Sequence, residues 1–422
     1  MKMLNKKILY SIIVVCLLFA NNSMIKANGG SIYSRYGLGD IYLENSAMKL
    51  SMGGLGTSIF SPKYINAVNP ASLSALNSTL FNINLDSRLL HVSDRENSAN
   101  YLDFKFQGFN IAFSIYDSLG IGFILGMSPY SLVDYEVDNG NVSKGNYTFN
   151  ERYEGTGGLS KIYFGLSFTL PFDFSIGATF NYYTGDIQYQ TANEYADSLG
   201  LYNTLFIAEN KYKGLGTTLG FESPDFAKLF NLNKFSNFRI GAFYEIAGSM
   251  NTDSSIVAVT SIGSKSFNKE DFLTKIPNKL GLGLSFIYDN NLVVAADYFY
   301  QPWSKFERNG IIKSKYLSDL KRYSLGVEVG NQLKKYGSFW ELVKYRCGLS
   351  YEESQYKING EKINVMGLHA GISFPLGINN SIDLGFMYGI RGKTENNLLK
   401  ENIFRISFSL NLNEMWFIRR EW

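Results

Sequence analysis

The sequence has little of the material from which catalytic and metal-binding sites are usually built. Its 422 residues include only two His and two Cys, and these show no spacing typical of a zinc site. Charged residues make up 18% of the chain, whereas a soluble domain usually has about a quarter. Beyond the N-terminal segment, no apolar run reaches the ~18 residues of a membrane helix. We therefore expect neither a metal nor another cofactor, and a passage through a membrane would have to use strands.

The two histidines, His91 and His369, offer little support for an enzyme. His91 lies near Ser93 and Asp94, a combination that superficially resembles the groups of a hydrolase. Closeness in sequence does not orient a triad, because a general base must lie within hydrogen-bond reach of its partner. We expect no enzymatic activity. A barrel enzyme, which would need a carboxylate near one of these histidines, is kept as an alternative.

The first residues have the pattern of an export signal. Lys2, Lys6 and Lys7 precede the apolar run 8–20, whose length fits the core of a signal peptide and is short for a membrane helix. Ala27 is the expected last residue of this leader. We predict a cleaved signal peptide over residues 1–27.

Removal of this leader changes the charge and the cysteine count. Four of the 40 basic residues are lysines of residues 1–27, so 36 basic residues remain against 37 acidic ones. This balance does not favour a nucleic-acid partner, because such binding is driven by positive charge. Cys16 belongs to the leader and lacks the small preceding residue expected at a lipid-attachment site. Cys347 is then the only cysteine, so no internal disulfide can form.

Apolar residues alternate with small or polar ones in several long stretches, including 174–183, 279–288 and 381–391. A further stretch, 403–412, has one apolar face made of Phe404, Ile406, Phe408, Leu410 and Leu412. Side chains of a strand alternate between its two faces, so each stretch predicts a strand with one apolar face. A soluble β-sandwich gives similar alternation, but its strands are usually about 5–6 residues long. Tilted membrane strands need about 9–11 residues, and these stretches are that long or longer. We predict a transmembrane antiparallel β-barrel.

Such stretches give fourteen expected strands, an even number as bacterial barrels require. They are expected near 79–90, 101–115, 119–135, 145–170, 173–190, 211–222, 237–250, 277–288, 291–303, 320–330, 343–355, 364–374, 380–392 and 402–412. The stretch 145–170 is kept whole, because dividing it at its glycines would make the count odd.

The expected connections alternate between short and long. Short periplasmic turns and long outer loops are typical of membrane barrels, and the long ones here are expected at 191–210, 251–276 and 304–319. The two connections 223–236 and 331–342 break this asymmetry.

Residues 28–78 differ from the rest, because Gly and Pro favour tight turns there over strands. Since this segment precedes the first strand, we expect it to fold back as a hatch inside the barrel. The domain boundaries are then 1–27 for the leader, 28–78 for the hatch and 79–422 for the barrel. The candidate hatch residues are Gly53, Gly54, Asn69, Pro70 and Ala71.

In this order, the motifs resemble the FadL-like outer-membrane transporters of long-chain fatty acids, a family that includes the aromatic-hydrocarbon channels. Residues 52–54 (Met-Gly-Gly) followed by 69–71 (Asn-Pro-Ala) resemble the family's hatch. The stretch 276–283 (Ile-Pro-Asn-Lys-Leu-Gly-Leu-Gly) resembles a mid-barrel strand, as does the strand after it, which ends at Trp303. Residues 345–352 and the final strands are similar as well. The resemblance touches most of the mature chain, although each motif is short.

This resemblance implies passive uptake of fatty-acid-like hydrophobic molecules through a hatched barrel of fourteen strands in the outer membrane of a Gram-negative bacterium. In that family, ligands leave sideways into the membrane through a gap at a kinked third strand. Pro129 lies in the expected third strand and is a candidate for the kink, since proline cannot donate to the ladder. The alternative is a proline at a bulge with no role in transport. The loop 91–100 is short and polar, so acid-binding residues of the family cannot be assigned there.

Charged residues of the strands are expected on the inward face, in contact with water in the lumen, because a charge facing lipid costs about 2–4 kcal/mol. A lattice of ion pairs is one interpretation; a counter-ion role of Arg346 or Arg391 toward a carboxylate ligand is the other. The expected lumen charges are Lys279, Asp297, Arg346, Glu352, Asp383, Arg391 and Arg405.

The expected partners are membrane lipids, a hydrophobic ligand and the barrel-assembly machinery that inserts the chain. That machinery is expected to read a terminal aromatic residue, either Trp422 or the pair Trp416 and Phe417. The alternative function is a barrel component of a protein secretion or assembly system that binds partner proteins. A removable plug with an apolar path would favour uptake, and a permanently filled lumen with a large exposed loop surface would favour partners.

Overall fold

The computed structural model describes residues 25–26, 30–43, 46–145, 147–195, 201–313, 315–332, 336–377 and 379–414. The expected leader lies outside these residues apart from β1 (Ile25–Lys26), and so does the expected assembly signal at Trp416, Phe417 and Trp422. Within the described residues, no helix is both long enough and apolar enough to cross a membrane.

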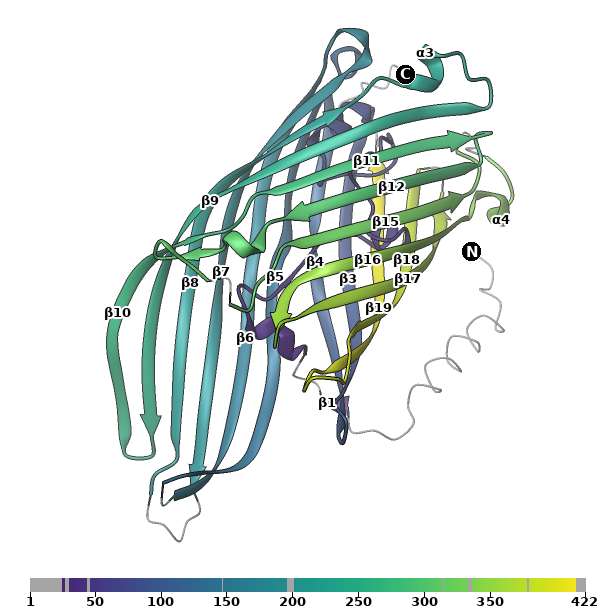
Figure 1. Ribbon diagram of the computed structural model, residues 1–422. Coiled ribbons are helices and arrows are strands. Elements are labelled where there is room, and N and C mark those ends of the chain that lie inside the picture. Colours follow the sequence, from purple (N-terminus) through teal and green to yellow (C-terminus); the bar gives the residue numbers. More distant parts are fainter. Residues whose placement is uncertain are drawn as a thin grey trace.

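Fourteen strands of the described chain pair with their neighbours and close into one antiparallel barrel (Figure 1). The last strand closes the ring by pairing with the first, for example Phe408 with Leu85. The predicted fold and strand number are thus confirmed. The fourteen strands are β3 (Thr79–Ser93), β4 (Ser98–Tyr116), β5 (Ile121–Lys144), β6 (Tyr147–Thr169), β7 (Ser175–Tyr195), β8 (Thr204–Glu222), β9 (Phe235–Thr260), β11 (Lys279–Tyr288), β12 (Leu292–Gln301), β15 (Leu320–Val329), β16 (Lys344–Ile358), β17 (Glu361–Leu376), β18 (Asn380–Gly392) and β19 (Lys400–Glu414).

One half of the barrel is much taller than the other. β5 to β9 have 19 to 26 residues, whereas β11, β12 and β15 have 10 each. An additional strand, β10 (Gly263–Lys275), pairs with the far half of β9. The outer ends of β5 to β9, together with β10, extend beyond the short strands, at the lower left of Figure 1. This extension is here called the wall. The expectation that 191–210 and 251–276 are loops was therefore wrong, since both contribute strand residues to the wall.

The far ends of several wall strands were missed, among them 136–144, 191–195 and 204–210. There the polarity of the two faces is reversed relative to the rest of the barrel. On β7, the outward positions Ile176 and Phe180 are apolar and exposed, and farther along the same face carries Asp186 and Glu194. The inward residue Ile187 is fully buried. Lipid selects an apolar outer face and water a polar one, so the change marks the edge of the membrane. The wall continues into water for roughly 30 Å along β7.

The connection after β12 folds inward and covers the lumen beneath the wall. It contains η6 (Trp303–Lys305), β13 (Glu307–Arg308) and β14 (Ile311–Ile312). Trp303, Phe306 and Leu317 are buried in one cluster with wall residues such as Tyr135 and Tyr212. This outer mouth is therefore filled by packed aromatic side chains.

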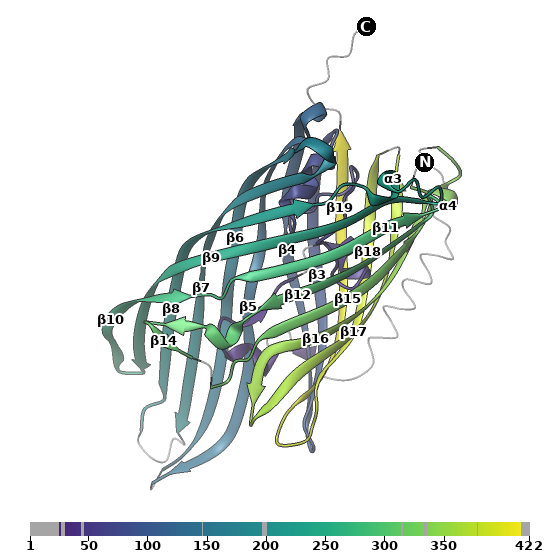
Figure 2. The same ribbon diagram turned by 45° about the horizontal axis from the view of Figure 1, so that its top comes forward.

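The end of the barrel opposite the wall is assigned to the periplasmic side, because bacterial barrels carry their long extensions on the outer side. The starts of β3 and the ends of β19 also lie at this end, because these two strands pair in antiparallel fashion there. Short helical turns make four of the connections (Figure 2): η3 (Asp117–Leu119), η4 (Pro171–Asp173), α3 (Phe226–Leu229) and α4 (Phe339–Leu342). The irregular connections 223–236 and 331–342 are those that hold α3 and α4.

The described residues between 30 and 78, here called the hatch segment, run through the inside of the barrel (Figure 1). They pack on strands from most of the circumference, which explains their lack of alternation: both sides of the segment are buried. Their elements are η1 (Ile32–Arg35), β2 (Asp40–Ile41), α2 (Ala47–Ser51) and η2 (Pro70–Ala75).

Candidate functional site

The helix α2 ends in a turn that offers its backbone to the barrel. Ser46 caps the start of the helix, and Gly53 and Gly54 end it with φ of 81° and 85°. This left-handed conformation suits glycine, which is why the Gly-Gly pair ends the helix here. The carbonyl oxygen of Gly53 then accepts hydrogen bonds from Arg322 Nη2 at 3.0 Å and Ser324 Oγ at 2.7 Å.

Asn69 connects the hatch segment both to itself and to β8. Its Oδ1 accepts from the backbone N–H of Ala71 at 3.2 Å and caps η2. Its Nδ2 donates to the carbonyls of Thr57 at 2.8 Å and Phe221 at 3.0 Å, and to Glu222 Oε1 at 3.1 Å. The side chain is fully buried. Every polar atom of Asn69 is thus used to hold the segment in place.

Pro70 and Ala71 pack directly against the inner face of the barrel, at two glycines that leave room for them. A Cβ on Gly177 would lie 2.4 Å from the carbonyl carbon of Pro70, and one on Gly220 would lie 2.2 Å from Asn69 Oδ1. Such distances are below van der Waals contact, so larger residues at these two glycines would displace η2.

Replacing Asn69 with alanine is expected to loosen η2 by about 2–3 kcal/mol, because it removes the cap and leaves buried carbonyls without donors. Hydrogen–deuterium exchange over residues 69–76 should then rise about 30- to 100-fold. Asn69→Asp should raise it further, since it sets a carboxylate beside Glu222. The control is Ser74→Ala, which removes a half-buried hydroxyl that contacts Ser175 and the carbonyl of Ala71 but leaves the cap in place. Unchanged exchange in both Asn69 variants would contradict the anchoring role.

Asp40 joins the hatch segment to strands at opposite ends of the sequence. Its carboxylate accepts from Arg391 Nη1 at 2.8 Å and Tyr356 Oη at 2.9 Å, and lies 3.5 Å from Arg88 Nη1. Burial alone would raise the pKa of Asp40, but Arg391 and Arg88 outweigh it and lower the pKa below its ordinary value. Asp40 is therefore held as an anion between two barrel cations.

The two arginines predicted as ligand counter-ions both contact carboxylates of the protein. Arg346 Nε donates to Glu328 Oε2 at 2.6 Å, and its Nη2 donates to Tyr64 of the hatch segment at 2.8 Å. Arg391, besides Asp40, donates through Nε to Glu401 at 2.6 Å. These contacts fit the ion-pair lattice. A role toward a carboxylate ligand stays a prediction.

Lys49 is buried in the hatch segment with 2% of its surface exposed. Among the described residues, its Nζ has no hydrogen-bond partner. Burial lowers the pKa of Lys49 to about 7, although the nearby carboxylate of Asp297 opposes this shift. Asp297 accepts through Oδ2 from the backbone N–H groups of Gly56 at 2.7 Å and Thr57 at 2.8 Å. An unpaired buried amine is costly, so Lys49 weakens the docking of its own segment.

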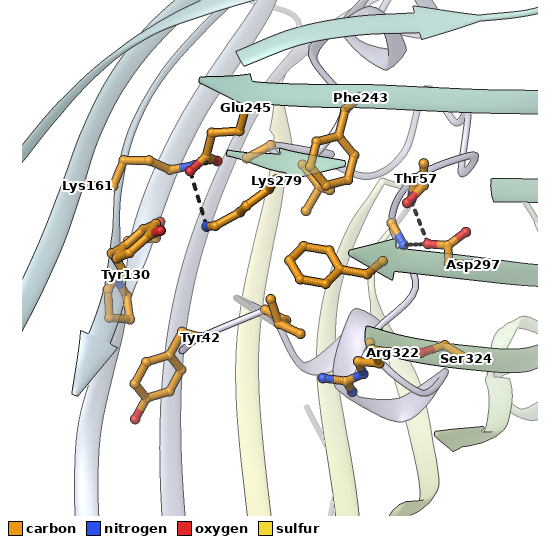
Figure 3. Close-up of a pocket in the computed structure, with 18 of the residues that line it drawn as sticks. Tyr42, Thr57, Tyr130, Lys161, Phe243, Glu245, Lys279, Asp297, Arg322 and Ser324 are labelled. Carbon is orange, nitrogen blue, oxygen red and sulfur yellow. Dashed lines mark hydrogen bonds and ion pairs between the residues drawn. The ribbon is translucent and has the colours of Figure 1, made fainter. Parts of the chain in front are cut away.

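A small cavity lies in mid-lumen, between the hatch segment and the barrel (Figure 3). Glu245 faces two cations there, with Lys161 Nζ at 3.0 Å and Lys279 Nζ at 3.1 Å. Lys279 Nζ also lies 3.9 Å from the centre of the Tyr130 ring. The cavity has a volume of about 80 Å³. Further lining residues include Tyr42, Thr57, Phe243, Asp297, Phe299 and Arg322.

β4 and β5 separate from one another part of the way along the barrel. The place where they separate is here called the seam. The residue pairs of these two strands run from Tyr116 with Ile121 to Phe109 with Met127 and end there. Pro129 lies two residues beyond, at an irregularity in the pairing of β5 with β6, and also lines the mid-lumen cavity. Whether it serves release of a ligand stays a prediction.

The hatch segment and an ion pair connect the two strands on either side of the seam. β2 pairs with Ser131 and Leu132 of β5, along the edge that β4 has left. Lys105 of β4 reaches across to Asp134 of β5 with Nζ 3.1 Å from Oδ2. The seam is therefore occupied on its inner side.

A larger cavity of about 400 Å³ lies at the periplasmic end, beside the described segment 59–64. Its walls mix apolar residues such as Met52 and Ile287 with Arg239, whose guanidinium lies 4.0 Å from the centre of the Phe60 ring. Hatch residues separate this cavity from the mid-lumen one.

The histidines take part in simple polar contacts. His91 Nδ1 lies 2.8 Å from the amide oxygen of Asn100, and His369 Nε2 lies 2.8 Å from Ser350 Oγ. Across the residues that the structure describes, no group of three or more His, Cys, Asp or Glu side chains could hold a metal ion. The absence of enzymatic activity stays a prediction.

Sequence reasoning named the hatch motif but missed the charged residues that are buried in it and around it. Lys49 was detectable in principle, because it is the one charged residue between Ser46 and Phe60. Glu245 and Asp40 carried no such signal, since their roles depend on which cations the closed barrel brings to them.

Known proteins can now be compared with this geometry. A family model described as BamG matches residues 3–422. No curated protein matches the sequence. Three similar solved structures show the shared fold. The Ralstonia pickettii toluene transporter TbuX has a TM-score of 0.58 and 16% identity, with 87% of this chain and 98% of that chain covered.

The other two give similar values. The Pseudomonas aeruginosa FadL homologue has a TM-score of 0.60 and 10% identity over 88% of this chain and 98% of that chain. The Pseudomonas putida toluene transporter TodX has a TM-score of 0.53 and 16% identity over 89% and 98%. The resemblance to the FadL-like transporters is confirmed at the level of the fold. Because its family model covers nearly the whole chain, this protein belongs to the BamG family.

Proposed function

We propose that this protein is a plugged outer-membrane barrel of a Gram-negative bacterium that binds partner proteins of a barrel-assembly or secretion system. The observation that carries this proposal is the filled lumen. The aromatic cluster around Trp303 closes the outer mouth, and hydrogen bonds of Asp40, Gly53 and Asn69 tie the hatch segment to several strands. Ion pairs buried at this depth resist opening, because separating them leaves unpaired charge.

The free space between these closures is divided into small cavities. The mid-lumen cavity has about 80 Å³, and a second one beside Asp40, Arg88 and Tyr356 has about 100 Å³. Each is smaller than the roughly 150 Å³ known to hold benzene. A partner-binding role needs no path through the lumen. It gains from a rigid barrel, because a preorganised surface loses less entropy on binding.

The tall wall supports the same proposal. Its six strands extend into water on one side of the barrel, where they offer surface without contributing to membrane passage. The name of the family, BamG, also hints at a link to barrel assembly.

Passive uptake of a hydrophobic, fatty-acid-like molecule is the second candidate, with lateral release at the seam beside Pro129. It is supported by the fold shared with the two toluene transporters and the FadL homologue. Uptake would require the hatch segment to move, since β2 occupies the inner side of the seam.

Co-purification separates the two candidates. The full-length protein is extracted from outer membranes in mild detergent and examined by native mass spectrometry, with lipid extraction in parallel. A partner role predicts stoichiometric protein partners that remain bound in Asn69→Ala. Uptake predicts a bound fatty acid or hydrocarbon that is lost in the same variant. An empty barrel that arrives alone would overturn the partner role.

A further inference from the structure

The wall presents its apolar side to water. Phe206 of β8, Ile256 of β9 and Phe267 of β10 are 40%, 43% and 42% exposed. Ile256 is directly opposite Phe267 in the pairing of β9 with β10. Phe206 is two residues from Ala208, the partner of Ile256 on β8. The three side chains share the inward face with the buried Tyr212 and Thr252, because residues of the same parity lie on one face of a strand.

Lipid does not cover this cluster. The outward face of the same part of β8 carries Glu209 and Lys211, which are unsuited to a membrane. Large apolar side chains exposed together on one face of a sheet are typical of an interaction surface.

The same strand β10 also has an open backbone edge. One side of β10 pairs with β9 along its length. On the other side, among the described residues, its strand pairing is limited to Thr274 and Lys275 with β13. A strand edge with free N–H and C=O groups is a template for another strand.

The direction of the amides identifies the edge-facing residues. The carbonyl of Leu273 accepts from Asn309 at 2.7 Å, so it points away from β9. Its partner on β9 is Asn251, so the backbone N–H and C=O of Asn251 also point away from β10. The same holds for the backbone groups of Val257 and Val259, which lie at alternate positions of the same strand. Ser266 pairs with Val257. The N–H of Ser266 therefore faces the open edge.

We propose that this edge binds an extended segment of an extracellular partner protein, which adds to β10 as a strand over residues 263–267. Its apolar side chains would cover Ile256 and Phe267, and an acidic side chain would meet Lys265. The ammonium of Lys265 lies 5.5 Å from the centre of the Phe267 ring and forms no ion pair with a described residue. Main-chain hydrogen bonds give such strand addition its affinity, and the side-chain contacts give it specificity.

Charge argues against a second copy of this chain as the occupant. Two β10 edges that pair around Ser266 would set the two Lys265 side chains close together on one face. Each Lys265 would then lie opposite Phe267 of the other copy, with the two ammonium groups at diagonal positions about 7–8 Å apart, where long side chains still reach one another and like charges repel. A partner with an acidic residue at that position has no such cost. This inference rests on the proposed partner-binding function and names the place where the partner binds.

Site-specific photo-crosslinking in cells tests the inference. A benzophenone amino acid replaces Phe267 in the full-length protein, and in the matched control it replaces Val257, which faces outward on the neighbouring strand. Crosslinking at 267 should give one partner protein, joined through an extended segment that contains apolar and acidic residues. Position 257 should give at least tenfold less of it.

The backbone contribution is tested with Ser266→Pro and Ser266→Ala. Proline removes the edge-facing N–H and is tolerated on an edge strand, while alanine keeps it. The crosslink from 267 should fall at least tenfold in Ser266→Pro and stay unchanged in Ser266→Ala. The heat-dependent gel mobility of folded barrels shows whether each variant has assembled; if the proline variant has not, the comparison is made with Lys265→Glu, which should lower the yield as well.

The outcomes separate this inference from the proposed function. Co-purifying partners that do not crosslink at 267, or crosslink there equally in Ser266→Pro, would overturn the β10 site and leave the partner role standing. A crosslink to a second copy or to lipopolysaccharide would also overturn it. If no partner co-purifies and none crosslinks, both are overturned.

Discussion

Replacing Asp40 with alanine is expected to release the first part of the hatch segment from the barrel. The change leaves Arg391 and Arg88 without the carboxylate between them and removes the hydrogen bond of Tyr356. Breaking a buried ion pair by removing one partner costs about 3–5 kcal/mol, and the lower end applies here because Arg391 keeps Glu401 and Arg88 keeps Asp103. Hydrogen–deuterium exchange over residues 31–43 should therefore rise by about 100-fold or more.

The expected pH dependence follows from the lowered pKa of Asp40. A carboxyl group whose pKa falls on docking stabilises the docked state above its ordinary pKa, and this contribution is lost as the pH falls through the lowered value. The difference between the protein and Asp40→Ala should thus be largest near neutral pH and shrink in acid.

An exposed ion pair provides the control. Asp138 lies 3.9 Å from Arg152, and both side chains are more than two fifths exposed. Asp138→Ala should leave exchange of residues 31–43 unchanged. Equal exchange in the protein and in Asp40→Ala would refute the idea that this charge holds the segment.

Replacing Lys49 with methionine is expected to have the opposite effect and to tighten the hatch segment. The amine is buried without a hydrogen-bond partner among the described residues, and its pKa falls from 10.5 to about 7. A difference of this size corresponds to at most about 5 kcal/mol. Methionine has a similar length, fills the same space and carries no charge.

The cost of burying the Lys49 amine depends on pH. Above about 10.5 the amine is neutral whether the segment is docked or released, so it costs nothing. As the pH falls to about 7, the released state takes up a proton that the docked state does not, and docking weakens. Below about 7 both are protonated and the cost is constant. Lys49→Met should remove this entire dependence.

Hydrogen–deuterium exchange over residues 46–54, corrected for the intrinsic effect of pH, measures this difference. Lys228→Met, at an exposed position of α3, is the control and should behave as the unaltered protein. If the gap between Lys49→Met and the protein is the same at pH 6 and pH 10, the buried amine is not its source.

The fold was predictable because its main signal is local. Alternation over ten or more residues, as in 403–412, fixes both the strand and the face that meets lipid, and the short turns define the order of pairing. The wall was the exception. On β7, the outward face changes from Phe180 to Asp186 and Glu194 within one strand, and the last residues, 191–195, were interpreted as part of a loop. The pairing with β6 and β8 shows that the strand continues.

The candidate site was predictable in part. Gly53, Gly54 and Asn69 stood out because turns and caps require these residue types, and the structure places them at contacts of the hatch segment with the barrel. Arg346 and Arg391 stood out as lumen charges, but their partners did not. Asp40 meets Arg391 across 351 residues of sequence, a pairing that no local pattern contains.

By itself, the sequence determined that this chain crosses a membrane as strands and that the segment before the first strand is different. It could do so because side chains alternate every residue along a strand, a property read within ten positions. The tertiary structure decided which charges meet, that Lys49 is buried without a hydrogen-bond partner among the described residues, and that the apolar face of the wall is turned to water. These follow from closure of the barrel, since closure alone sets the distances between residues that lie hundreds of positions apart.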